Sequence, residues 1–149
     1  MRIVTKAYGA KDVDERQRLH FPGGIPGFAD LLEWVLLDAA EQPFYWLQSV
    51  DRQDVAFVLL DPKVFRPDYD PEVDPEELAE IGIHSPEDVL VFSIVTIPEN
   101  PNLMTANLQG PVIINRRTRV GRQCVSLDPR WHVRHAVLEE MGAVRQHAC

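Results

Sequence analysis

The sequence has few cysteines and no long apolar run, and these absences exclude several classes of protein. Its 149 residues include two cysteines, Cys124 and Cys149, which are too few for the disulfide framework of a small secreted domain. No stretch approaches the roughly 18 consecutive apolar residues of a membrane-spanning helix. The segment from Met1 to Lys6 lacks the apolar core of a secretory signal, so we expect a cytoplasmic protein.

Basic residues are missing from the middle of the chain. Residues 67–99 contain ten acidic side chains and no lysine or arginine, so the net charge of −8 is unevenly spread. Such a surface repels phosphate backbones, which argues against direct nucleic-acid binding, and it steers a basic protein partner. Four later arginines are expected on an exposed hairpin, where they offset the acidic side: Arg116, Arg117, Arg119 and Arg122.

Short segments with β-branched or alternating apolar residues recur along the chain, and turn residues separate them. They cover residues 2–7, 18–21, 33–37, 44–50, 55–60, 89–97, 111–115 and 120–127. This pattern is typical of an antiparallel barrel or sandwich. We therefore predict a mainly β, antiparallel β-barrel-like single domain over residues 1–149, with a few short helices.

One short helix is predicted by its end signals. Asp74 can cap it and Pro75 suits its first position, while Glu77 completes a capping box. Gly82 suits its end, which predicts a helix over residues 75–81. Earlier in the chain, GGIPGF (residues 23–28) predicts a rigid turn that leads into a short helical segment. A phosphate cradle is less consistent with it, because no lysine, serine or threonine follows.

The stretch TANLQGPVIIN, residues 105–115, is a strand pattern that carries unusual polar residues. Asparagine is depleted in strands, so Asn107 and Asn115 are expected to hold corners or bulges. Gly110 and Pro111 are expected to interrupt the run before a short buried strand over residues 112–114. This stretch contains no nucleophile, metal ligand or phosphate cradle.

Histidines and a cysteine near the end of the chain offer a possible zinc site. His132 and His135 are closely spaced, with Cys124 nearby and His147 and Cys149 further on. A structural zinc site shows paired ligands at tight spacing on both sides, and only one such pair is present. We expect no metal or cofactor, with both histidines on a surface strand or helix edge.

Thiol catalysis is the other chemical alternative. Cys124 is its nucleophile candidate, with His132 or His135 as base and Asp128 to orient it. The apolar neighbours of Cys124 indicate burial, and no helix start lowers its pKa. We therefore expect Cys124 to pack as a small apolar group, and we assign no catalytic residue.

Five motifs occur in an order and spacing that resemble one protein family. They are FPGGIPGF (21–28), PFYWLQS (43–49), FRPDYD (65–70), TANLQGPVIIN (105–115) and GRQCVSL (121–127). Together they resemble the bacterial flagellar assembly factor FliW, over residues 3–135. Two positions depart from the family pattern, which more often has alanine at Gly110 and tyrosine at Trp131. The tail over residues 137–149 matches no family feature, so its role stays open.

The resemblance implies a non-enzymatic protein-binding regulator of flagellar assembly. Family members antagonise the RNA-binding translational regulator CsrA and also bind flagellin. Accumulating flagellin then occupies the factor and frees CsrA, which lowers flagellin translation. We expect these two protein partners, no membrane contact and a monomer when free. A small Cys/His enzyme and a generic scaffold protein remain as alternatives.

Two surface features are candidates for these contacts. The acidic loop, residues 68–72, places Asp68, Asp70 and Glu72 around Tyr69, and tyrosine is enriched at binding hot spots. An amphipathic flagellin helix requires an apolar groove. Candidate contact residues beside the 105–115 stretch are Leu103, Met104, Asn107 and Leu108. Leu103, Met104 and Leu108 fit a buried core equally well.

Overall fold

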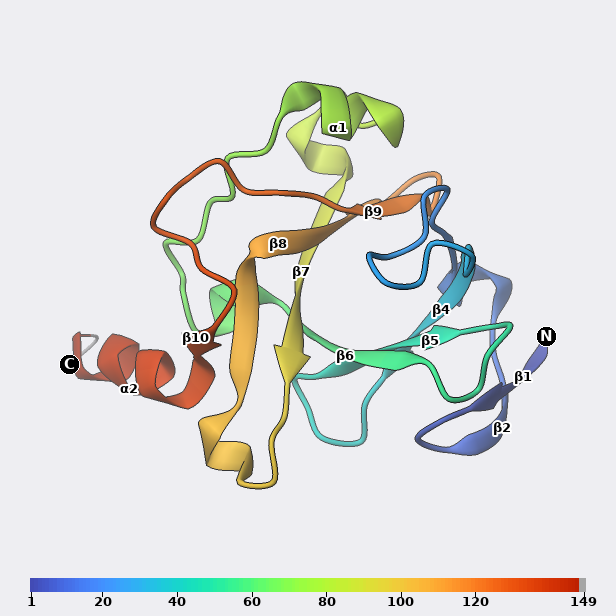
Figure 1. Ribbon diagram of the computed structural model, residues 1–149, viewed down its shortest axis with the longest axis horizontal. Helices are drawn as coiled ribbons and strands as arrows, with labels where there is room; N and C mark the ends of the chain where they lie inside the picture. The colour runs from blue at the N-terminus through green and yellow to red at the C-terminus, as the bar shows by residue number, and fades with distance from the viewer. Residues whose placement is uncertain (148–149) are drawn as a thin grey trace.

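Eight strands form one antiparallel sheet that wraps into a nearly closed barrel (Figure 1). The computed structural model describes residues 1–147, and the side chains of residues 1–143. The strands of this sheet are β3 (Arg18–His20), β4 (Glu33–Asp38), β5 (Tyr45–Ser49), β6 (Ala56–Leu60), β7 (Val89–Thr96), β8 (Thr105–Asn115), β9 (Gly121–Gln123) and β10 (His135–Ala136). They are ordered β10-β8-β7-β6-β5-β4-β3, and β9 also pairs with β8. A separate hairpin joins β1 (Arg2–Thr5) to β2 (Gly9–Asp12).

One backbone contact joins the ends of the barrel wall. His20 of β3 forms a parallel bridge with Val120, which lies between β8 and β9. The His20 N–H donates a 2.9 Å hydrogen bond to the carbonyl of Arg119. The mainly β, antiparallel barrel-like fold predicted from the sequence is thereby confirmed. The strands β2 and β10 were not predicted, because each is short and lacks a clear alternating pattern.

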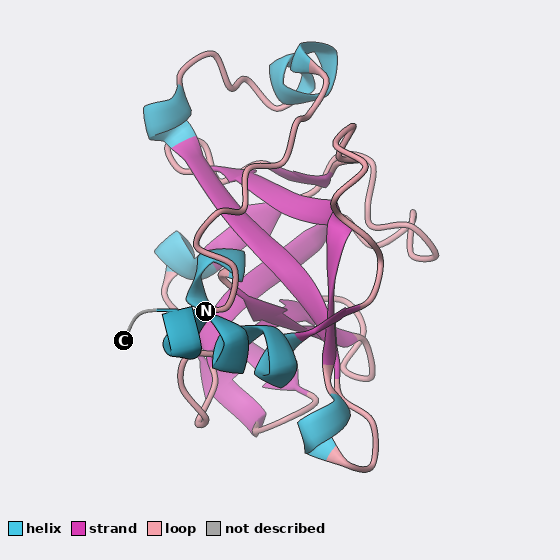
Figure 2. Ribbon diagram, turned by 90° about the vertical axis from the view of Figure 1, so that its left-hand side faces the viewer, coloured by secondary structure: helices cyan, strands magenta, loops and turns pink. Residues whose placement is uncertain are grey.

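The helical segments lie at the periphery of the molecule, around the strands (Figure 2). The α-helices of the described chain are α1 (Pro75–Glu80) and α2 (Val137–His147), and the 3₁₀ turns are η1 (Glu15–Gln17), η2 (Pro62–Val64), η3 (Pro86–Asp88) and η4 (Pro101–Leu103). Each 3₁₀ turn begins after a residue whose side chain accepts a backbone hydrogen bond: Asp14, Asp61, Ser85 and Asn100. Within residues 1–147, no helix is long and apolar enough to cross a membrane.

The barrel interior is filled by large apolar side chains. Trp34, Phe21 and Leu47 are fully buried there, and the Trp34 ring lies 6.2 Å from that of Phe21. Gly121 of β9 permits this packing, because a Cβ atom at that position would stand 2.7 Å from the Phe21 ring. Phe21, one hundred residues earlier in the chain, therefore restricts the first residue of the GRQCVSL motif to glycine.

A bulge in β8 redirects its side chains. The pairing of β7 with β8 shifts between Phe92 and Ile94, and Asn107 accepts hydrogen bonds from the N–H groups of Gln109 and Gly110. Before the bulge, Ala106 and Leu108 pack into an outer apolar cluster. After it, Val112 and Ile114 point into the barrel. Because of the bulge, β8 contributes side chains both to the barrel interior and to the outer apolar cluster.

The predicted roles of the two asparagines are confirmed. Asn107 holds the bulge, and Asn115 holds the corner after β8 by accepting from Arg117 N–H and donating to the Ile81 carbonyl. The expected interruption at Gly110 and Pro111 is wrong, since β8 runs continuously through both residues. The bulge accommodates Gly110 and Pro111 without ending the strand.

The helix α1 was predicted nearly to its ends. Asp74 accepts from Glu76 N–H at its start, and Gly82 follows it with a φ of 73°. The predicted capping box is wrong in one respect. The Glu77 carboxylate instead accepts from the Arg122 side chain and from Val125 N–H. It therefore ties α1 to the segment after β9.

The helical segment expected after the GGIPGF turn is wrong. Residues 22–30 form consecutive turns, in which Gly24 and Gly27 take positive φ values of 66° and 88°. A right-handed helix cannot continue through such residues. The turns bring Gly24 so close to the following chain that a Cβ atom there would lie 2.5 Å from the Phe28 carbonyl oxygen.

Candidate partner-binding surface

Tyr69, at the centre of the acidic loop, is a core residue. Only 3% of it is exposed, and its hydroxyl donates a 2.7 Å hydrogen bond to the Leu108 carbonyl. Its ring packs edge-on against Trp131, with 4.8 Å between ring centroids. This burial raises the pKa of the Tyr69 phenol. The expectation that Tyr69 offers an exposed ring to a partner therefore needs correction, because it anchors the loop from inside.

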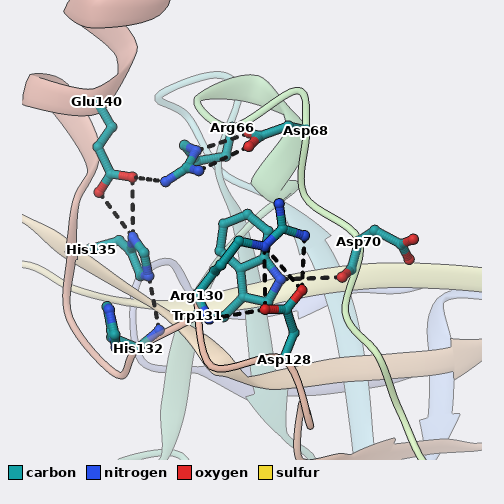
Figure 3. Close-up of polar contacts among 9 residues, drawn as sticks. All are labelled: Arg66, Asp68, Asp70, Asp128, Arg130, Trp131, His132, His135 and Glu140. Carbon is teal, nitrogen blue, oxygen red and sulfur yellow. Dashed lines mark hydrogen bonds and ion pairs between the residues drawn. The ribbon is translucent and has the colours of Figure 1, made fainter.

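Trp131 is the second anchor of the loop. It is 1% exposed, and the guanidinium groups of Arg66 and Arg130 lie over its ring at 4.7 and 5.0 Å. Its indole N–H donates a 3.2 Å hydrogen bond to the carbonyl of Asp70 (Figure 3). Leu127 N–H donates to the Glu72 carbonyl at 2.6 Å. The backbone of the acidic loop is thus fixed, while its carboxylates are left to the surface.

A chain of polar contacts connects this region to α2. Arg66 makes two hydrogen bonds to Asp68 and a third, of 2.7 Å, to Glu140 of α2. The bond from Arg66 lowers the pKa of Asp68, and the same interaction raises the pKa of Arg66. Glu140 also contacts Nδ1 of His135 at 3.1 Å (Figure 3). The described part of the tail therefore docks on the loop through Glu140.

The surface position expected for both histidines is wrong for His135. It is 7% exposed, and its Nε2 accepts a 2.9 Å hydrogen bond from His132 N–H. Since Nε2 accepts, the ring proton belongs on Nδ1, where it is directed at Glu140. Among the side chains that the structure describes, those of residues 1–143, no three His, Cys, Asp or Glu side chains gather as a metal-binding group. His147 and Cys149 of the proposed zinc set lie outside the described side chains.

Cys124 packs as predicted. It is 1% exposed and lies in an apolar cluster with Ile81, Ile83 and Ile113. Burial raises the pKa of its thiol to about 12. The hydrogen bond of its sulfur is to the Arg122 carbonyl, at 4.0 Å, rather than to a histidine. This environment opposes the thiolate that nucleophilic catalysis requires.

The acids of residues 67–99 divide into two groups. Four are engaged in ion pairs within the chain: Asp68 with Arg66, Glu77 and Glu80 with Arg122, and Asp88 with Arg117. The arginines of the β8–β9 hairpin thus offset part of the acidic side, as expected. Six others are exposed and have no ion-pair partner within the described chain: Asp70, Glu72, Asp74, Glu76, Glu87 and Glu99.

An open groove of about 820 Å³ lies between the acidic loop and α1. Tyr69 and Asp70 contribute to its lining, together with apolar residues that include Val73, Leu78 and Val89. These apolar residues were not among the predicted contacts. The available signal was the recurrence of valine, leucine and isoleucine inside an otherwise acidic, proline-rich segment.

The predicted contacts around η4 and β8 do not form one exposed surface. Leu108 is fully buried and Met104 is 9% exposed, so both belong to the outer core cluster with Trp131. Leu103 is 64% exposed. Asn107 is partly buried and uses its side chain to hold the bulge. The alternative that Met104 and Leu108 are core residues is the one that the structure supports.

Comparison with known proteins places the whole arrangement in one family. The family model described as FliW protein matches residues 2–137. The chain is 43% identical over 143 residues to the flagellar assembly factor FliW of Treponema denticola, covering 96% of this chain and 97% of the relative. The FliW of Leptospira biflexa is 44% identical over 141 residues, covering 93% of this chain and 92% of that protein.

A solved structure extends the similarity to the fold. The crystal structure of a flagellar assembly factor FliW superposes with a TM-score of 0.85 at 34% identity, covering 92% of this chain and 96% of that one. The family model spans the residues of the barrel, the acidic loop and β8. The chain therefore belongs to the FliW family of flagellar assembly factors.

Proposed function

We propose that this chain is a non-enzymatic, protein-binding regulator of flagellar assembly that acts in the cytoplasm. It antagonises a CsrA-type RNA-binding regulator and binds flagellin, so that the flagellin level controls flagellin translation. The observation that carries the proposal is an exposed, unpaired acidic surface on a chain of the FliW family. Such a switch requires only that two partners bind with different occupancy, and no covalent step.

The electrostatic part of the proposal follows from what an RNA-binding partner must carry. A protein that binds phosphate backbones presents lysine and arginine. The exposed carboxylates of Asp70 and Glu72 attract that surface, and an acidic protein docked beside it weakens RNA binding by repulsion as well as by contact. Asp68 contributes less, because Arg66 already neutralises it.

The direct test is comigration. Purified protein is mixed separately with CsrA and with flagellin, and each mixture is resolved by size-exclusion chromatography. The proposal predicts a complex with each partner, and flagellin is expected to lower the amount of protein bound to CsrA. Failure of both partners to comigrate would contradict the proposed function.

A charge reversal tests the electrostatic part. The double variant Asp70→Lys/Glu72→Lys is expected to slow association with CsrA about tenfold at low salt and to flatten its salt dependence. Asp68 is left unchanged, which preserves its ion pair with Arg66. The matched control is Glu41→Lys/Asp51→Lys, at two exposed acids of other loops. An association rate equal to that of the control would remove the electrostatic component.

A further inference from the structure

We propose that the groove between the acidic loop and α1 is the docking site for a short amphipathic helix of a partner protein, with lysine or arginine beside its apolar face. This inference rests on the proposed protein-binding function and locates the binding of one partner in this groove. The groove is open and has a volume of about 820 Å³.

Apolar side chains from two strands and a helix line the groove. Val89 and Val91 of β7 line it together with Ile113 of β8, and Leu78 of α1 contributes from the helix. Ile113 and Leu78 also belong to the cluster around Cys124, so this lining rests on packed core. A surface with such support is preformed, and binding requires little ordering of the chain.

The prolines of the groove bear on the backbone conformation of its occupant. Pro62, Pro71, Pro75 and Pro86 all line it. Proline has no N–H group, so these four positions offer no backbone donor to an extended peptide. A helix satisfies its own backbone hydrogen bonds and presents apolar side chains on one face. The groove therefore suits helix docking better than strand addition.

The charges around the groove select a basic occupant. Asp61 and Asp70 line the groove and are exposed. Among the residues that line it, Lys63 alone is a lysine or arginine. Glu72 and Glu76 add unpaired, exposed carboxylates in the same segment. An occupant with lysine or arginine beside its apolar residues is therefore favoured, and an acidic helix is repelled.

The probe for this site is a fluorescein-labelled synthetic peptide of about 14 residues, with leucines spaced i, i+3, i+4 and i+7 and lysines elsewhere. Its control replaces every lysine with glutamate and keeps the apolar face. Binding of the full chain is followed by fluorescence anisotropy. The lysine peptide is expected to bind at least about tenfold more tightly than the glutamate peptide.

Protein variants then localise the binding. Ala79 is an exposed helix residue that lines the groove, so Ala79→Arg obstructs the groove without removing a core side chain. It is expected to weaken peptide binding about tenfold, while Ala40→Arg, which adds the same charge on another loop, changes it less than about twofold. Asp70→Lys is expected to weaken binding about fivefold, with Asp51→Lys as its control. Thermal melts confirm that each variant is folded.

Three results would overturn the inference. The first is equal binding of the two peptides, and the second is unchanged peptide binding by folded Ala79→Arg. The third is a concentration-dependent dimer of the wild type that Ala79→Arg abolishes, which would assign the groove to a second copy of the chain.

Failure of the proposed function can be distinguished from failure of this inference. If CsrA and flagellin still bind while the peptide result is negative, only the groove assignment is lost; if neither protein binds, the peptide assay still decides the groove.

Discussion

The hydroxyl of Tyr69 donates a 2.7 Å hydrogen bond to the backbone carbonyl of Leu108, and this bond joins the acidic loop to the signature strand β8. Leu108 lies at the bulge, where β8 pairing with β7 is interrupted, so its carbonyl is available to a side chain. Tyr69 thereby connects two of the motifs that resemble the FliW family. The position of the surface carboxylates depends on a contact inside the core.

Removal of that hydroxyl tests the connection. Tyr69→Phe leaves the buried Leu108 carbonyl without its partner, and we expect the free energy of unfolding to fall by about 1 to 2 kcal/mol. Urea denaturation measures the change. Tyr45→Phe is the matched control, because the Tyr45 hydroxyl makes no hydrogen bond within the described chain and its ring is only partly buried. Equal stability of the two variants would show that the Tyr69 bond contributes nothing net.

The GGIPGF turn offers a second matched pair. Gly24 has a φ of 66°, and an added Cβ atom would stand 2.5 Å from the Phe28 carbonyl oxygen, so Gly24→Ala is expected to destabilise the fold by about 2 kcal/mol or more. A Cβ atom at the adjacent Gly23 meets nothing within 4 Å. Gly23→Ala is expected to change stability by less than about 0.5 kcal/mol. Thermal melts of both variants check the contrast, which disappears if the turn can rearrange freely.

Most of the barrel was predictable from local signals. Strand segments such as residues 33–37 and 55–60 carry β-branched and apolar residues, and Asp74 with Gly82 delimits α1. These features depend on neighbouring residues in the chain. The pairing of β10 with β8 depends instead on Val137 and Met104 meeting across more than thirty residues, which no local pattern reports.

The candidate surface was less predictable, because exposure is a property of the folded chain. Tyr69 in a charged, proline-rich loop has the composition of a binding hot spot. Its burial depends on contact with Trp131, which is sixty-two residues further along the chain. The pairing of Asp68 with Arg66 is by contrast local, because the two residues stand two positions apart in the chain.

The Asp68–Arg66 pair predicts a pH dependence. Arg66 lowers the pKa of Asp68 below its ordinary value of 3.8, so the folded state binds this proton less readily than the unfolded state does. The pair therefore contributes its full stability above pH 3.8, and the contribution is lost as the pH falls through the folded-state pKa. Asp68→Asn is expected to lower the melting temperature at pH 6, with the difference from wild type shrinking below about pH 3. Because Asp68 is largely exposed, the effect is expected to be small.

A control for this prediction is Asp51→Asn, at an exposed acid without an ion pair in the described chain. Its melting temperature is expected to follow that of the wild type at both pH values. A difference for Asp68→Asn that persists unchanged at low pH would mean that the residue acts through packing or backbone conformation rather than through its charge.

The burial of Cys124 predicts an unreactive thiol. With its pKa raised to about 12, only about one molecule in ten thousand carries the thiolate at pH 8. In a Cys149→Ser background, which leaves Cys124 as the single cysteine, iodoacetamide labelling of the native protein is expected to be at least about a hundredfold slower than labelling in urea. Mass spectrometry follows the modification. Slow labelling would agree with a buried, protonated thiol, whereas rapid labelling of the native protein would reveal an accessible thiolate and would restore the thiol-enzyme alternative.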